Sequence, residues 1–159
     1  ALILRDNSTV IYSVQQVKGM YLFKKTADGQ ITQLTDSDTG TFAISADENL
    51  LAIEVVDKVT EKTHTELRSL EDGKIIKTFD IISRRQIRFT PDGKNIAYDA
   101  NYGDLPQIMI QPIDGGEPFP LTDFQSEDIF SFDWSQDGNR LAVIRGRQLS
   151  DAVLIKSTK

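Results

Sequence analysis

The sequence predicts an all-β protein built of repeated four-stranded units, and three observations support this. No segment shows sustained helical periodicity. A strand–acidic turn–strand pattern recurs along the chain: Asp47, Asp92 and Asp137 are spaced 45 residues apart, and Asp6 precedes Asp47 by 41 residues. Between these turns, Asp-Gly pairs separate further short apolar runs, which is a strong hairpin pattern. Four short strands in about 40–45 residues, repeated, are typical of β-propeller blades.

A β-sandwich is also built of short strands and is the alternative fold. It does not require the same two turns to recur at a near-fixed period, so the repeat favours the propeller. We therefore expect a single β-propeller segment of four-stranded antiparallel meander blades, with about four blades in the chain. These would form a partial ring or the C-terminal portion of a larger propeller. The expected blades are approximately 1–41, 42–84, 85–128 and 129–159, the last lacking its fourth strand.

The first two strands of each unit are joined by the acidic turn, as in "FTPDGKNIAYDA" (89–100) and "FDWSQDGNRLAVI" (132–144). An Asp side chain accepts hydrogen bonds from the backbone that follows it, and Gly93 and Gly138 can adopt a positive φ without steric cost. The turn is therefore predicted to be architectural. First strands are expected near 1–5, 42–46, 86–90 and 130–135, and second strands near 10–14, 50–55, 95–100 and 140–145.

A second turn of the Asp-Gly type lies between the third and fourth strands. It occurs at Asp28-Gly29, Asp72-Gly73 and Asp114-Gly115. Third strands are expected near 20–25, 65–70, 107–112 and 152–156, and fourth strands near 31–35, 75–79 and 118–122.

The composition restricts the classes of partner. A hydrophobic fraction of 39% and a charged fraction of 26% in 159 residues are those of a globular domain. The net charge of −6 argues against nucleic-acid binding, which depends on Lys and Arg neutralising phosphates. No apolar run approaches the ~20 residues that span a bilayer, so no direct membrane contact is expected in this segment. The absence of cysteine excludes disulfides and thiol chemistry.

Three stretches resemble a known family. "FTPDGKNIAYDA", "FDWSQDGNRLAVIRG" and "QPIDGGEPFPLTDF" resemble the WD-repeat-like blades of TolB-type propellers, in which an S/T-P-D-G-K turn precedes the second strand and a D-G-G-x-P-x-x-L-T hairpin leads to the fourth. The stretch 85–155 also resembles the C-terminal propellers of bacterial serine/threonine kinases and winged-helix transcriptional regulators. The first two units depart from the pattern, because "RDNST" and "SADEN" lack Pro and Gly.

The resemblance implies a protein- or ligand-binding propeller, the sensor or interaction region of a larger bacterial signalling protein. An extracytoplasmic location is favoured by the same resemblance, with the cytoplasm as the alternative. The alternative function is the accessory propeller of a prolyl-oligopeptidase-type hydrolase. Propellers host many roles, so the motifs specify the fold more closely than the function.

No catalytic or metal-binding pattern is found. His64 is the only histidine and lies in a charged stretch, where we expect an exposed loop or strand-edge residue. "DSDTG" (36–40) has the alternating carboxylates of a calcium loop but lacks its terminal Glu. Trp134, beside Phe130 and Phe132, is expected to pack between blades. The sequence therefore predicts a non-enzyme without cofactor or metal.

The candidate binding residues come from the loops instead. Connections from second to third strands and from each blade to the next share one face of a propeller, and loops on a rigid scaffold commonly carry binding. Mixed charge with an aromatic ring suits polar recognition of a protein or small molecule. The candidates are Arg84, Arg85, Tyr102, Asp104, Glu127, Asp128, Arg145 and Arg147.

The strand count predicts an open arc. The last unit has no fourth strand, and the first begins directly at its innermost strand. Uncovered sheet edges and faces are normally paired or covered. We therefore expect self-association through the open blades or their completion by further sequence; two paired arcs would form a ring of about eight blades.

Overall fold

The computed structural model describes residues 1–57 and 59–149. This part of the chain consists of strands joined by turns, with no helix. Each sheet is an antiparallel meander in chain order. The all-β prediction is confirmed, whereas the third strand expected at 152–156 lies outside the described residues.

Three sheets have four strands each, and we call them blades 1 to 3. Blade 1 comprises β1 (Leu2–Ile3), β2 (Val10–Gln16), β3 (Gly19–Lys25) and β4 (Ile31–Gln33). Blade 2 comprises β5 (Thr39–Ile44), β6 (Leu50–Val56), β7 (Thr63–Ser69) and β8 (Ile75–Phe79). Blade 3 comprises β9 (Ile87–Phe89), β10 (Asn95–Tyr102), β11 (Leu105–Pro112) and β12 (Phe119–Pro120).

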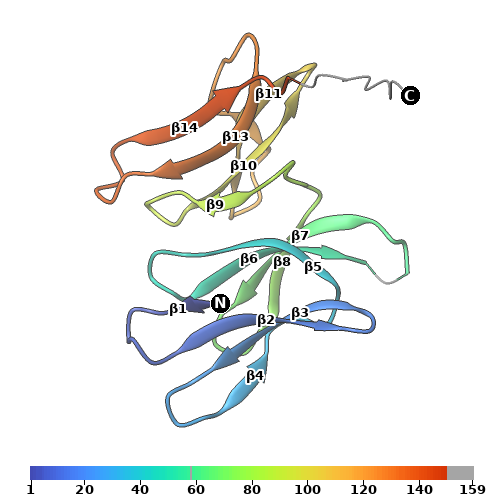
Figure 1. Cartoon of the computed structure of the whole chain (residues 1–159), viewed down its shortest axis with the longest axis vertical. Helices are drawn as coiled ribbons and strands as arrows, with labels where there is room; N and C mark the ends of the chain where they lie inside the picture. The colour runs from blue at the N-terminus through green and yellow to red at the C-terminus, as the bar shows by residue number, and fades with distance from the viewer. Residues whose placement is uncertain (58, 150–159) are drawn as a thin grey trace, which may run out of the picture.

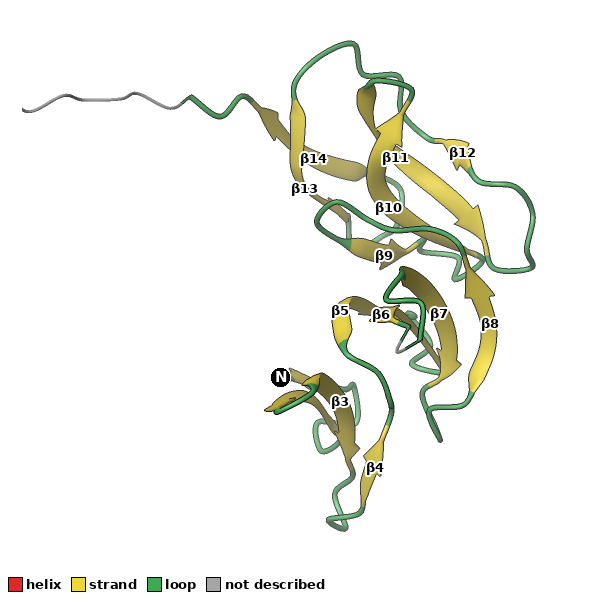
Figure 2. Ribbon diagram, turned by 90° about the vertical axis from the view of Figure 1, so that its right-hand side faces the viewer, coloured by secondary structure: helices red, strands yellow, loops and turns green. Residues whose placement is uncertain are grey.

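The hairpin of β13 (Asp128–Trp134) and β14 (Leu141–Gly146) forms what we call blade 4. The blades follow one another in chain order, from blade 1 at one end to blade 4 at the other (Figures 1 and 2). The arrangement is that of a partial propeller.

The acidic turns have the hydrogen bonds that their sequence predicts. In blade 3, the Thr90 hydroxyl donates to Asp92 Oδ1 (2.6 Å), and the Lys94 amide donates to the same oxygen (3.0 Å). The same pair of bonds recurs at Ser45–Asp47–Asn49 and at Ser135–Asp137–Asn139. The residue after the Asp has a positive φ in all four blades: 57° at Asn7, 59° at Glu48, 68° at Gly93 and 72° at Gly138.

Each junction between blades has its own apolar core. Residues of β2 and β3 in blade 1 pack on β6 of blade 2, with Ile11, Leu22, Leu51 and Ile53 at most 1% exposed. The core between blades 2 and 3 is the largest and includes Ala52, Leu67, Ile87, Phe89, Ile96 and Tyr98. The core between blades 3 and 4 is smaller and consists of Ala97, Ile108, Ile110, Ile129 and Phe132.

A buried arginine also links blades 1 and 2. Arg68 is 5% exposed, and its guanidinium donates to Glu66 Oε2 (2.6 Å), to the Leu34 carbonyl (2.9 Å) and to Asp36 Oδ1 (2.9 Å). Charge-assisted bonds of this kind compensate for the desolvation of the guanidinium. The linker that leaves β4 is therefore fixed to blade 2.

Candidate functional site

The structure brings three of the predicted loop residues together. Asp128, at the start of β13, accepts a hydrogen bond from Arg84 Nη1 (2.7 Å) and lies 3.5 Å from Arg85 Nη2. The bond from Arg84 is the largest cause that holds the pKa of Asp128 below its usual range. Arg85 also lies over the Phe130 ring, with its Cζ 5.1 Å from the ring centroid. These four side chains join the linker before β9 to β13.

Arg145 extends the same charged region. It is paired with Ile129 in the β13–β14 ladder, one residue beyond Asp128. Its guanidinium lies 3.7 Å from the centroid of the Phe124 ring and donates to the Ser126 carbonyl. The guanidinium is thus held by a ring and a carbonyl of the β12–β13 connection.

The other predicted loop residues, as far as the structure describes them, take no part in these ion pairs. Tyr102 ends β10 and is 59% exposed, and Asp104 follows it in the β10–β11 turn. Within residues 1–57 and 59–149, no ion pair joins Asp104, Glu127 or Arg147 to the Arg84–Asp128 pair. Glu127 directly precedes Asp128 and has a φ of 70°. The binding role of all eight residues stays a prediction.

A buried carboxylate that the sequence analysis missed fixes the linker of this region. Asp99 is 1% exposed, and its Oδ1 accepts hydrogen bonds from the backbone amides of Arg85 (3.0 Å) and Gln86 (2.9 Å). Burial raises the pKa of Asp99, with the two amide bonds acting in the opposite direction. Glu54, 45 residues earlier, is also buried and accepts from the Ser83 amide (2.5 Å). Two acidic residues at the same position of successive apolar strands could have indicated this role.

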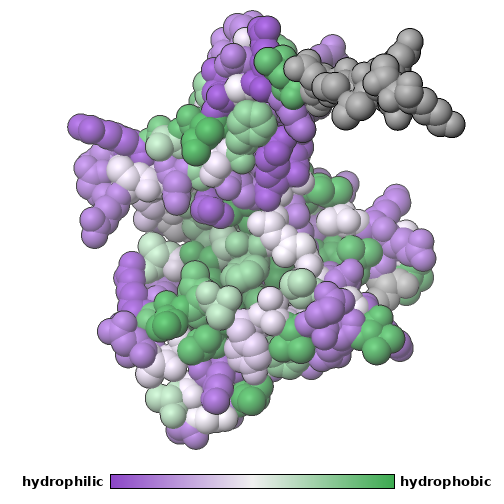
Figure 3. Space-filling model, viewed as in Figure 1, coloured by the Kyte–Doolittle hydropathy of each residue, from purple (hydrophilic) through white to green (hydrophobic). Residues whose placement is uncertain are grey.

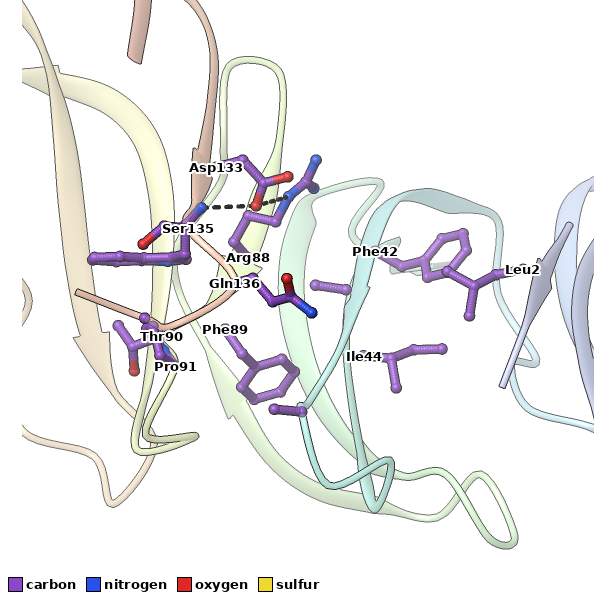
Figure 4. A pocket seen from close by; sticks show the side chains of 14 residues that line it. Leu2, Phe42, Ile44, Arg88, Phe89, Thr90, Pro91, Asp133, Ser135 and Gln136 are labelled. Atoms are coloured by element: carbon purple, nitrogen blue, oxygen red, sulfur yellow. Dashed lines mark hydrogen bonds and ion pairs between the residues drawn. The ribbon is translucent and has the colours of Figure 1, made fainter. Parts of the chain in front are cut away.

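The second candidate site is a cavity on the inner side of the arc, with a volume of about 580 Å³. Its walls come from the first strands of all four blades and from the turns that follow β9 and β13 (Figure 4). The apolar walls include Leu2, Phe42, Ile44, Phe89 and Trp134, and the polar side chains include Arg88, Asp133, Ser135 and Gln136.

The polar side chains occupy one wall of this cavity. Arg88 Nε, from β9, lies 3.8 Å from Asp133 Oδ1, from β13, and Figure 4 shows these side chains across the cavity from Leu2, Phe42 and Ile44. The arrangement suits a ligand with an apolar body and a polar end. The Ser135 hydroxyl donates to Asp137 (2.5 Å), the same bond that the Ser45 and Thr90 hydroxyls make in the turns of blades 2 and 3, so it is part of the turn.

Trp134 both confirms and extends the expectation for it. The indole packs against the core between blades 3 and 4, as expected, and it also lines the cavity. Its Nε1 is buried without a hydrogen-bond partner among the described residues. No feature of the sequence places Trp134 and Leu2 around one cavity, because their relative position depends on how the blades curve.

The two candidate sites lie at opposite ends of the same strands. Arg84 and Arg85 precede β9, and Asp128 begins β13, whereas the cavity is lined by the last residues of β9 and β13 and by their turns. The cavity therefore lies toward the acidic turns of these strands, away from the predicted loop residues.

The described residues contain no group of three His, Cys, Asp or Glu side chains placed to bind a metal. His64 lies in β7 and is half-buried rather than exposed; its Nε2 is 3.3 Å from Glu66 Oε1, which belongs to the Arg68 network. No helix in residues 1–57 and 59–149 is long and apolar enough to cross a membrane.

Comparisons with known proteins identify the fold. No protein-family model matches the chain, and no curated protein matches its sequence. Among solved structures, TolB from Acinetobacter baumannii is similar over 87% of this chain and 35% of its own, with 20% identity and a TM-score of 0.70. A putative TolB from Agrobacterium tumefaciens is similar over 91% of this chain and 52% of its own, with 15% identity and a TM-score of 0.72. The chain has a TolB-like β-propeller fold.

A third neighbour extends the similarity to other propellers. The β-propeller domain of Cps50 (Swd1) from Myceliophteria thermophila is similar over 87% of this chain and 49% of its own, with 12% identity and a TM-score of 0.59. At such identities the likeness concerns the fold. The chain spans about a third and about half of the two TolB chains. None of the three neighbours is a kinase or winged-helix regulator, so that part of the resemblance is unsupported.

Proposed function

We propose that this chain is a non-catalytic propeller segment that binds a protein partner or small ligand in the cavity on the inner side of the arc. The cavity itself is the observation that carries this proposal. In the same proposal the chain is the sensor or interaction region of a larger bacterial signalling protein.

The chemistry of the cavity supports a mixed ligand, such as a peptide with an apolar side chain. A volume of about 580 Å³ falls in the usual range of ligand sites. Burying one aromatic or branched aliphatic side chain against Phe42, Ile44 and Trp134 would contribute about 1.5–3 kcal/mol. The Asp133 side chain is 71% exposed and so remains open to a ligand's amide or cation.

The loop residues provide weaker support for a binding site. Asp128 already neutralises part of the charge of Arg84 and Arg85, and Arg145 is engaged by Phe124 and a carbonyl. These contacts fix the junction between blades 3 and 4. Their side chains are therefore less available for a ligand than the walls of the cavity.

Tryptophan fluorescence tests the proposal, because Trp134 is the only tryptophan and lines the cavity. The probe is a panel of short peptides, each with one central Phe, Tyr or Leu. Saturable changes in emission are expected for at least one peptide, and Leu2→Ser and Asp133→Asn should weaken that binding. Tyr102→Ala, at the other end of the strands, is the matched control and should leave it unchanged. Binding that depends on Tyr102 and not on Leu2 would place the ligand at the loops instead.

Turnover assays test the non-catalytic part of the proposal. Peptidase, esterase and glycan-lyase substrates should give rates indistinguishable from buffer. Activity that disappears in a His64→Ala variant would overturn it and would favour an enzymatic role.

A further inference from the structure

Asp-Gly pairs recur in the turns of this chain, and one of the five differs chemically from the others. The pairs are Asp28-Gly29, Asp72-Gly73, Asp92-Gly93, Asp114-Gly115 and Asp137-Gly138. In such a pair the glycine amide nitrogen can attack the aspartate side-chain carboxyl, because glycine has no side chain to obstruct the approach. The resulting succinimide hydrolyses to aspartate or to isoaspartate. Each pair is therefore a candidate site for a covalent change in the backbone.

Solvent exposure does not distinguish the five pairs, because all five aspartates are exposed. Figure 3 shows a hydrophilic projection (purple) on the left of its upper half, where Figure 1 places the turn between β13 and β14 that contains Asp137. The turn between β11 and β12, which contains Asp114, lies on the outer side of blade 3, beside β8 (Figure 2). The difference between the pairs lies in their hydrogen bonds.

Four of the aspartates are held as carboxylates by a donor side chain. In three turns the donor is a hydroxyl two residues before the aspartate: Thr26 to Asp28 (2.5 Å), Thr90 to Asp92 (2.6 Å) and Ser135 to Asp137 (2.5 Å). At Asp72 the donor is the Lys74 ammonium, 2.6 Å from Oδ2. These bonds are the largest causes that hold the pKa of the four side chains below their usual range. An ionised carboxylate is a poor electrophile, because one of its oxygens must leave as water.

Asp114 has no such donor among the described residues. Pro112 occupies the position that Thr26 has in the equivalent hairpin of blade 1. The one printed bond to the Asp114 carboxyl comes from the Gly116 amide, at 3.1 Å from Oδ1. The bond from the Gly115 amide to the Pro112 carbonyl is 3.1 Å long, compared with 2.8–2.9 Å for the corresponding bonds of the other four glycines. Both reacting groups are therefore less restrained at this pair.

Lys77 of blade 2 acts on the nucleophile. Its ammonium donates to the Asp114 carbonyl, which belongs to the same peptide unit as the Gly115 nitrogen. Loss of the amide proton leaves a negative charge shared by that oxygen and nitrogen, and a hydrogen bond from a cation stabilises this charge. When the succinimide opens to isoaspartate, the Asp114 carbonyl becomes a free carboxylate beside the same ammonium. The cation therefore favours both the attack and the isoaspartate product.

We propose that Asp114 is a modification site of this chain, at which isoaspartate forms through attack by the Gly115 nitrogen, promoted by Lys77. The nitrogen forms a bond to Asp114 Cγ, and the carboxyl hydroxyl leaves with the amide proton as water. A second water molecule then cleaves the bond between the Asp114 carbonyl carbon and the nitrogen: its hydroxyl goes to the carbon and its proton to the nitrogen. The product has one additional methylene group in the main chain of the β11–β12 turn. The site is independent of the function proposed for the cavity.

Peptide mapping after prolonged incubation at neutral pH in heavy-oxygen water tests the proposal. Opening of a succinimide incorporates the heavy oxygen, and electron-transfer fragmentation distinguishes isoaspartate from aspartate. Isoaspartate is expected to form several-fold faster at Asp114 than at Asp28, the matched pair in the hairpin of blade 1. An equal or higher rate at Asp28 would overturn the proposal.

The same incubation in urea separates the folded structure from the local sequence. Unfolding removes the hydrogen bonds that distinguish the pairs, so the excess at Asp114 over Asp28 should largely disappear. An excess of the same size in the unfolded chain would show that the local sequence causes it, and would overturn the assignment to these contacts.

Substitutions test the two contributions separately, with Asp28 as the internal reference in every variant. Pro112→Thr supplies a hydroxyl at the position of Thr26 and should slow the reaction at Asp114 several-fold; an unchanged rate would contradict the role of the missing donor. Lys77→Met keeps the length of the side chain without its charge and should also slow the reaction, whereas Lys77→Arg should retain the rate. Acceleration in Lys77→Met would show that Lys77 restrains the turn and would overturn its assigned role.

Discussion

The acidic turns of blades 2 and 3 have the same backbone conformation, but they differ in the residue that adopts the positive φ. In blade 3 the residue after Asp92 is Gly93, with a φ of 68° and open space where a Cβ would be. In blade 2 the residue after Asp47 is Glu48, with a φ of 59°. A left-handed conformation is unfavourable for Glu by about 1 kcal/mol or more.

A contact between blades explains how Glu48 is tolerated. Its Oε1 accepts a hydrogen bond from the backbone amide of Arg5 in blade 1 (2.8 Å). Gly93 makes no such contact and has no strain to offset. The comparison indicates that one backbone geometry is stabilised locally in blade 3 and through a neighbouring blade in blade 2. The following predictions test that difference.

The largest effect is expected at the turn of blade 4. Gly138 has a φ of 72°, and a Cβ added there would lie 2.6 Å from the Cβ of Pro91 in the turn of blade 3. Gly138→Val therefore combines backbone strain with a clash between blades, and we expect a loss of about 2–4 kcal/mol in the free energy of unfolding. Urea denaturation measures it. A loss no greater than that of Gly93→Val would show that Pro91 moves aside freely.

A smaller loss is expected at Gly93, where only the backbone conformation is unfavourable. Gly93→Val should lower the free energy of unfolding by about 1–3 kcal/mol, and Gly93→Asn by less, because Asn tolerates the left-handed region. The same denaturation experiment checks both variants. Equal losses for Val and Asn would mean that the turn changes conformation when Gly93 is replaced.

These turns also show how far the sequence determines the fold. The spacing of Asp47, Asp92 and Asp137 predicted the strands and their order, because a turn depends on residues close together in the chain. Glu48 did not reveal its positive φ, since its compensating partner, Arg5, lies 43 residues away. The cavity could not be predicted for the same reason: Leu2 and Trp134 line one cavity only because of the curvature of the arc.

The loop residues illustrate the same limit. Arg84, Arg85 and Asp128 were selected for their charge and their place in connections, and the structure brings these three together. Tyr102 and Asp104 were selected on the same grounds and lie on a separate hairpin. Asp99 was not selected, although Glu54 at the equivalent position of blade 2 is a signal for it, because the sequence does not show which backbone amides either carboxylate accepts from.

Lowering the pH should remove the stabilising effect of the Asp92 carboxylate in its turn. It should also remove the destabilising effect of the buried Asp99 charge. Hydrogen bonds from the Thr90 hydroxyl and the Lys94 amide lower the pKa of Asp92, so its stabilising effect is present above its unfolded pKa of about 3.9 and is lost as pH falls through its folded value. Burial raises the pKa of Asp99, so its ionisation disfavours the folded state as pH rises. Urea midpoints measured from pH 2 to 7 should fall less at low pH for Asp92→Asn than for the protein that keeps Asp92.

Asp99→Asn is the companion variant, because it keeps an oxygen for the Arg85 and Gln86 amides and removes the buried charge. Its stability relative to the parent should improve from low to neutral pH, the reverse of Asp92→Asn. Parallel pH profiles for the two variants would contradict the assignment of opposite pKa shifts.

The smallest effect is expected at Glu48, where two terms of similar size oppose each other. Glu48→Gly removes about 1 kcal/mol of backbone strain and also removes the bond to the Arg5 amide, which is worth about 0.5–1.5 kcal/mol. The net change in the free energy of unfolding should therefore lie within about 0.5 kcal/mol of zero. Glu48→Ala keeps the strain and loses the bond, so it should be less stable than Glu48→Gly by about 1 kcal/mol. If the Ala and Gly variants were equally stable in urea, the strain at Glu48 would be relieved by movement of the turn, and the contrast with Gly93 would not hold.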